Sequence, residues 1–218
     1  MKKYIVLVFL IISISCQQKA KKNRKLQVVT TTTMITDLVK NIGGDKIDIQ
    51  GLMGAGVDPH LYKASEGDVS KFFNADVIVY NGLHLEGKLE DVFEKMRQQN
   101  KQTIAASDAL DTATLIGSEY FASNYDPHIW FSITNWEIIT QYITDKLCEL
   151  DADNAATYKL NGANYLKTLA SLKTVIAAQV NSLPVEKRIL VTAHDAFNYF
   201  GKEFQFNVVG LQGLSTAT

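Results

Sequence analysis

The sequence has few of the residues on which disulfide-stabilised scaffolds, membrane bundles and nucleic-acid-binding proteins depend. Its 218 residues include only two cysteines, three prolines and four histidines. After the N-terminus there is no apolar run of the about 20 residues that a membrane-spanning helix needs. The 22 basic and 23 acidic residues nearly balance, which argues against a nucleic-acid partner, because such a partner needs clustered positive charge. A hydrophobic content of 46% predicts a globular body with an ordinary core.

The N-terminus is the one region with a different composition. Two lysines open it, residues 4–12 are almost entirely apolar, and small residues precede Cys16. This order predicts a signal peptide over residues 1–15, after which Cys16 becomes a lipidated N-terminus. Ser13 stands where a bacterial lipobox usually has leucine, so a plain secretory signal followed by an incidental cysteine is the alternative.

Residues 16–25 are polar and rich in lysine, and they predict a flexible tether that holds the body off the membrane. If Cys16 carries lipid, Cys148 has no partner for an internal disulfide. Cys148 lies on the apolar face of an expected helix, so we expect a buried, small hydrophobic side chain there.

From residue 26 onward, short β-branched or apolar runs alternate with segments of helical periodicity. Such alternation predicts parallel βαβ units, and hence an α/β fold with doubly wound sheets. The expected strands are residues 28–32, 47–52, 77–80, 103–105, 189–192 and 206–211. The expected helices are residues 34–42, 65–73, 89–96, 132–150 and 154–183.

The last of these helices predicts the domain organisation. At a rise of 1.5 Å per residue it would be about 40 Å long, enough to join two lobes side by side. We expect an N-terminal α/β lobe over residues 26–150, a linking helix over 151–184, and the start of a C-terminal α/β lobe over 185–218. Two short strands and one helix cannot close a core, so we expect this second lobe to be incomplete and the chain truncated within it. The expected apolar stripe of the linking helix is Tyr158, Tyr165, Leu169, Leu172, Ile176 and Val180.

Two of the three prolines lie in a repeated tripeptide, Asp-Pro-His, which ends at His60 and again at His128. A third histidine, His194, follows an expected strand. All three are in loops near the carboxyl ends of strands or at a helix entrance, where ligands collect in open α/β sheets. Because 68 and then 66 residues separate them, only the tertiary fold can bring them to one metal ion. Proline restricts the backbone on both sides of its bond, which suits an imidazole held at a fixed angle.

The histidines and the Asp-Pro pairs also have less specific interpretations than a metal site. A single histidine in a loop is more often a surface residue than a ligand, and Asp-Pro is a common turn opener. The repetition of the tripeptide favours a ligand role for His60 and His128. His84 lacks that context, and we expect it to be structural or to lie near the rim of the cleft.

Several passages resemble the TroA-like zinc/manganese solute-binding lipoproteins (cluster A-I type) that serve ABC importers. The resemblance covers essentially the whole chain and implies two α/β lobes joined by one long helix, with metal between them. It implies His60, His128 and His194 as ligands, with a fourth, an aspartate, beyond Thr218. The passages are VDPH at 57–60, VIVYNG at 77–82 with LE at 85–86, DPHIW at 126–130, TAHDAF at 192–197 with YF at 199–200, and GLQGLST at 210–216.

The choice of metal is less constrained than the site. Many manganese-type members have glutamate at the third position, so His194 resembles the zinc-type and mixed members. Zinc-type members often have a histidine-rich loop before the second ligand, and residues 110–126 contain no histidine. Three neutral imidazoles suit Zn²⁺, which we favour over Mn²⁺. Because only neutral imidazoles bind metal, we expect binding to weaken as the pH falls through the histidine range.

We therefore expect a receptor that delivers Zn²⁺ or Mn²⁺ to an ABC permease. It would be monomeric and lipid-anchored in the cell envelope, on the periplasmic or extracellular face. A zinc hydrolase would use the same three histidines. However, no general base is evident, since Asp58, Asp126 and Asp195 fit roles in holding the imidazoles. The third hypothesis is a surface adhesin that uses the metal for structure.

Overall fold

The computed structural model describes residues 24–119 and 123–211. The predicted signal peptide, Cys16, most of the predicted tether and nearly all of the last motif, at 212–216, lie outside these ranges. No helix within them is both long and apolar enough to cross a bilayer.

Four parallel strands form the sheet of the N-terminal lobe, in the order β2-β1-β3-β4. Because β3 pairs with β1 on the side opposite β2, the chain winds in both directions from the centre of the sheet, as the sequence predicts. A doubly wound sheet of this kind places the loops that follow its strands along one edge. The strands are β1 (Leu26–Thr30), β2 (Ile47–Gly51), β3 (Val77–Tyr80) and β4 (Gln102–Ala105).

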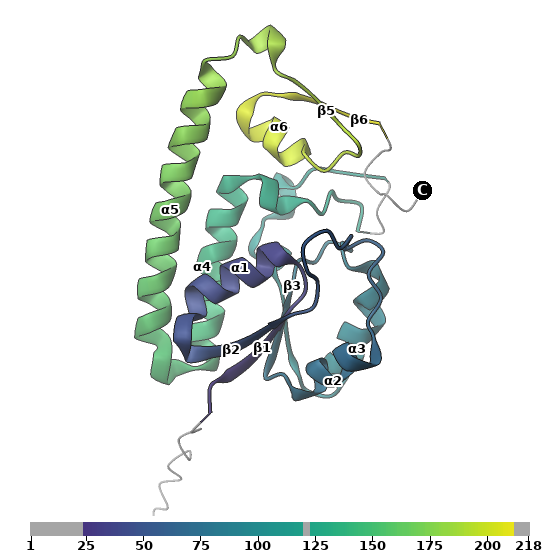
Figure 1. Ribbon diagram of the computed structural model, residues 1–218, viewed down its shortest axis with the longest axis vertical. Coiled ribbons are helices and arrows are strands. Elements are labelled where there is room, and N and C mark those ends of the chain that lie inside the picture. The colour runs from purple at the N-terminus through teal and green to yellow at the C-terminus, as the bar shows by residue number, and fades with distance from the viewer. Residues whose placement is uncertain (1–23, 120–122, 212–218) are drawn as a thin grey trace, which may run out of the picture.

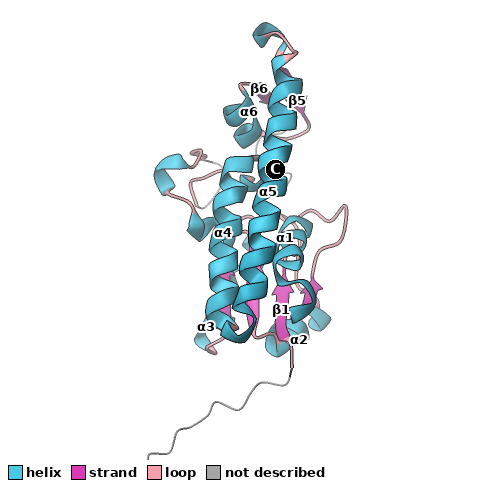
Figure 2. Cartoon of the chain, turned by 90° about the vertical axis from the view of Figure 1, so that its left-hand side faces the viewer, coloured by secondary structure: helices cyan, strands magenta, loops and turns pink. Residues whose placement is uncertain are grey.

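Helices cover both faces of this sheet (Figures 1 and 2). On one face α1 (Thr33–Gly43) packs with the two long helices, and on the other lie α2 (Glu66–Asn74) and α3 (Glu90–Gln98). Neighbouring residues of a strand point to opposite faces, so Ile78 packs in the α2–α3 core while Val79 packs in the α1 core. A continuous apolar strand such as β3 is the sequence signal of a sheet that is covered on both sides.

The predicted start of α2 is confirmed in detail. Ser65 Oγ accepts a hydrogen bond from the Asp68 backbone N–H at 3.2 Å, and an Asp68 carboxylate oxygen accepts one from the Ser65 N–H at 3.0 Å. This reciprocal pair is a capping box. It fixes the point at which the loop carrying His60 ends and the helix begins.

Two antiparallel helices, α4 (Ile133–Leu150) and α5 (Ala155–Asn181), form the spine of the molecule. The apolar face of α4 is buried, with Ile139 and Ile143 fully enclosed. The prediction for α5 is wrong at Leu172, which is 46% exposed. The C-terminal end of α5 extends beyond α4 (Figure 1), and Lys173, next to Leu172, already reaches the first turn of α4 at Thr134, so part of the stripe is uncovered.

Cys148 is free, as predicted, but it is only partly buried. Its Sγ lies 3.5 Å from the carbonyl oxygen of Ala155, where the chain turns from α4 into α5. The proximity of this turn to solvent explains why burial is incomplete.

The second lobe consists, within the described residues, of one βαβ unit. β5 (Ile189–Thr192) and β6 (Asn207–Gly210) pair in parallel, with α6 (Asn198–Phe204) between them in the chain. The bounds of α6 are not among the ranges expected from sequence. α6 packs closely on the Val208 side of the sheet, whereas Ile189 and Val191 point away from it and are 57% and 59% exposed.

Replacing Gly162 tests the close approach of α4 and α5. A Cβ at this buried position would lie 3.0 Å from Thr144 Cγ2 and closer still to Thr144 Oγ1. We expect Gly162→Val to lower the free energy of unfolding by about 1–3 kcal/mol through overpacking, as measured by denaturant titration. The matched control is Gly67→Val, at an exposed position of α2, where we expect a change within about 0.5 kcal/mol. Equal effects would contradict this account of the spine.

Candidate metal centre

The structure brings together the three histidines that the sequence singles out. His60 lies in the loop between β2 and α2, His128 in the loop before α4, and His194 directly after β5. One ring nitrogen from each lies within 4.8 Å of the others. His60 Nε2 and His128 Nε2 are 3.2 Å apart. Two imidazoles therefore come from the N-terminal lobe and one from the second lobe.

These separations suit a single small cation. Zn–N bonds of about 2.0–2.1 Å in tetrahedral geometry place two ligand nitrogens about 3.3 Å apart. The His60–His128 pair already has this spacing. The ring of His194 lies 6.3 Å from that of His60 and 5.4 Å from that of His128, centroid to centroid. An adjustment of the order of 1 Å would bring its nitrogen to the same ion.

The repeated tripeptide forms the same turn twice. In both copies the aspartate Oδ1 accepts a hydrogen bond of 2.9 Å from the backbone N–H of the histidine, at His60 from Asp58 and at His128 from Asp126. The proline between them restricts the backbone, so each turn presents its imidazole in a fixed direction. The sequence repeat is thus a repeat of local structure.

Asp126 also holds the ring of its histidine. Its Oδ1 lies 2.7 Å from His128 Nδ1, and both side chains are buried, with exposures of 0% for Asp126 and 2% for His128. When Nδ1–H donates to this carboxylate, the lone pair of Nε2 is free for a metal ion. Asp126 thereby fixes both the tautomer and the direction of the ring.

Two residues of α6 that sequence reasoning did not single out also contact Asp126. Asn198 Nδ2 donates to Asp126 Oδ2 at 3.1 Å and to the backbone oxygen of Asp195, also at 3.1 Å. Tyr199 donates its hydroxyl hydrogen to the Asp126 carbonyl at 2.9 Å. Tyr199 lies in a quoted family passage, but nothing in the sequence near Asn198 indicates that it reaches the other lobe.

A second network of polar side chains holds the backbone just before His128. The Glu86 carboxylate is 1% exposed and accepts hydrogen bonds from Thr31 Oγ1 at 2.6 Å and from the Asn81 N–H at 2.8 Å. Asn81 Nδ2 in turn donates to the carbonyl of Pro127 at 2.9 Å. Burial raises the pKa of Glu86, while these donors lower it. The network ties the loop after β3 to the residue before His128.

Burial and the neighbouring imidazole of His128 lower the pKa values of His60 and His194 and so favour their neutral forms. Burial, followed by the nearby His128, lowers the pKa of His60 from 6.5 to about 4. The pKa of His194 is also lowered, again by burial first and then by His128. Neutral imidazole is the form that binds a metal ion. His84 lies outside this group, with its Nδ1 3.6 Å from Glu90 Oε1.

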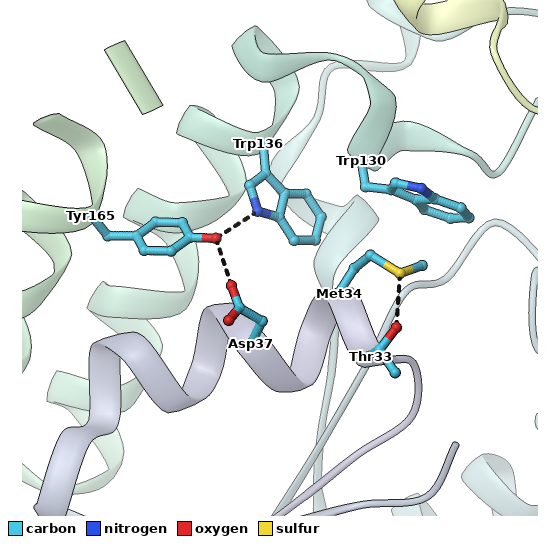
Figure 3. Close-up of a pocket in the computed structure, with 6 residues that line it drawn as sticks. All are labelled: Thr33, Met34, Asp37, Trp130, Trp136 and Tyr165. Carbon is cyan, nitrogen blue, oxygen red and sulfur yellow. Dashed lines mark hydrogen bonds between the residues drawn. The ribbon is translucent and has the colours of Figure 1, made fainter. Parts of the chain in front are cut away.

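A pocket of about 310 Å³ opens between α1, α4 and α5 (Figure 3). The Tyr165 hydroxyl accepts a hydrogen bond from Trp136 Nε1 at 3.3 Å and donates to Asp37 at 3.2 Å. The Trp130 ring also lines the pocket and packs 5.3 Å from the His128 ring, centroid to centroid. Both tryptophans of the chain are here, so their fluorescence reports on this region.

Comparison with known proteins agrees with the fold. The "Manganese-binding lipoprotein MntA" of Bacillus subtilis (strain 168) is 44% identical over 194 residues, which is 89% of this chain and 63% of the relative. The "Zinc-binding protein TroA" of Treponema pallidum (strain Nichols) is 42% identical over 199 residues, which is 91% of this chain and 64% of the relative. The chain thus spans less than two thirds of the length of either protein.

A solved structure of the periplasmic zinc-binding protein TroA from Treponema pallidum superposes with a TM-score of 0.85 at 42% identity, covering 89% of this chain and 69% of that one. The family described as "Zinc-uptake complex component A periplasmic" (ZnuA) matches residues 28–218. On this match and these identities, the chain belongs to the ZnuA family of metal-uptake proteins.

Proposed function

We propose that the chain is the metal-binding receptor of an ABC importer and that His60, His128 and His194 are ligands of its cargo. The convergence of three imidazoles from loops far apart in the sequence carries this proposal. Neither relative named above is named for adhesion or hydrolysis; one is named for manganese binding and the other for zinc binding. The protein is accordingly a carrier rather than a catalyst.

The place of action follows from the same argument. A receptor for an importer works outside the cytoplasmic membrane, and one relative is named a lipoprotein. We infer that Cys16 carries a lipid anchor, that residues 16–25 are the tether, and that an ABC permease is the partner. The folded body that follows the tether is a monomer made of the two lobes and the helix α5.

For the cargo we favour Zn²⁺ over Mn²⁺ as the more tightly bound ion. Three imidazoles are strong ligands for zinc, and affinity for Mn²⁺ is lower at almost any nitrogen-rich site. Asp126 strengthens this preference, because a carboxylate that accepts the Nδ1–H raises the basicity of the His128 imidazole.

Substituting each histidine tests the ligand set. We expect His60→Ala, His128→Ala and His194→Ala each to lower Zn²⁺ affinity by more than the about 10–100-fold that is typical of losing a residue that only holds a ligand. The measurement is competition with a chromogenic chelator, with tryptophan fluorescence as a second reading. His84→Ala is the matched control and should bind as the wild type does. If one of the first three variants bound Zn²⁺ as tightly as the wild type, the histidine that it replaces would not be a ligand.

The lowered pKa of His60 predicts a pH dependence of stability. Between pH 6.5 and about 4 the unfolded chain protonates His60 while the folded chain does not. The unfolded state then binds more protons, so the stability of the metal-free protein falls as the pH falls through this window. We expect the unfolding temperature of His60→Gln to fall less steeply over this range than that of the wild type. His84→Gln is the control, and parallel curves for His60→Gln and the wild type would contradict the assignment.

A further inference from the structure

The proposed site depends on how the two lobes are held against each other. His60 and His128 belong to the N-terminal lobe and His194 to the second lobe. Within the described residues the polypeptide passes between these lobes once, through α5. Contacts made by α6 must therefore set the position of His194 relative to the other two imidazoles.

One side chain of α6 bonds at once to the loop that carries His128 and to the loop that carries His194. The Asn198 amide has two N–H donors. One reaches the carboxylate of Asp126, two residues before His128, and the other reaches the carbonyl of Asp195, directly after His194. The same Asp126 carboxylate holds the His128 ring through its other oxygen. A continuous chain of hydrogen bonds thus joins the His194 loop to the His128 imidazole.

We propose that Asn198 is a positioning residue of the metal site, which acts through Asp126 to hold the His128 ring in register with the loop of the second lobe. The inference rests on the proposed function, because it assigns Asn198 a part in binding the same cation.

Loss of the amide should act locally. Asp126 Oδ2 would lose its donor inside the protein, and a buried acceptor without a partner costs free energy that the carboxylate can reduce only by rotating. Rotation would shift the oxygen that holds His128 Nδ1. The lobes themselves stay joined, because Glu203 accepts a hydrogen bond of 2.6 Å from Ser132 and Lys202 donates one of 3.0 Å to the Thr114 carbonyl.

A double-mutant cycle tests this chain of contacts. The variants are Asn198→Ala, Asp126→Asn and the two together, and the probe is Zn²⁺ alone, with affinity measured by chelator competition at fixed pH. We expect Asn198→Ala to weaken Zn²⁺ binding by about 10–100-fold in the wild-type background. In the Asp126→Asn background the same change should weaken binding less than about threefold, because groups that act through one another are not additive.

The matched control is Asn207→Ala, at an exposed position of β6, which should leave the affinity unchanged. Unfolding temperatures of the metal-free proteins are measured alongside, and Asn198→Ser serves if the alanine variant does not fold. An equal loss in both backgrounds, or no loss beyond that of the control, overturns the role of Asn198 and leaves the proposed function standing. Failure of the wild type itself to bind Zn²⁺ overturns both proposals.

Discussion

The buried carboxylate of Asp126 joins the parts of the molecule that carry the candidate ligands. Burying a charge costs several kcal/mol unless hydrogen bonds compensate, and here His128 and Asn198 supply donors to its two oxygens. The backbone of the same residue is also fixed, since its carbonyl accepts from Tyr199. One residue of the N-terminal lobe is thus held by donors from its own loop and from the second lobe, and the position of the His128 ring follows from it.

The topology of the sheet explains why supporting residues gather on the other side of His128. β1 and β3 are neighbours at the point where the winding direction reverses, so the loops after them open a crevice at the sheet edge. Thr31 follows β1 and Asn81 follows β3, and the Glu86 carboxylate bonds to both. A buried carboxylate that accepts several hydrogen bonds is held in one position. Asn81, whose backbone N–H donates to this carboxylate, also donates from its side chain to the carbonyl of Pro127 and so holds that carbonyl in place. The site is therefore supported from the fold's centre as well as from the second lobe.

Much of the fold and of the candidate site could be predicted from the sequence, and the features that could not be predicted have physical reasons. Strand β3 and the start of α2 near Ser65 follow from local rules of burial and hydrogen bonding, and both were predicted to within a residue or two. The paired tripeptides predicted His60 and His128 because the same local turn occurs twice. Asn198 could not be found this way, since its role depends on a contact with Asp126, 72 residues away. The exposed Leu172 was missed because periodicity shows which residues share a helix face but not how far the neighbouring helix extends.

The wide separation of the three histidines along the chain affects how metal binding is coupled to folding and to resistance to proteolysis. No short segment contains more than one of them, so a nascent or partly unfolded polypeptide lacks a high-affinity site. On the proposed function, the metal ion would bind the native state and stabilise it by mass action, by about 2.7 kcal/mol when the free ion is at 100 times its dissociation constant. Metal-bound and metal-free molecules would then differ in resistance to proteolysis, and the protein would be longest-lived while it holds the ion.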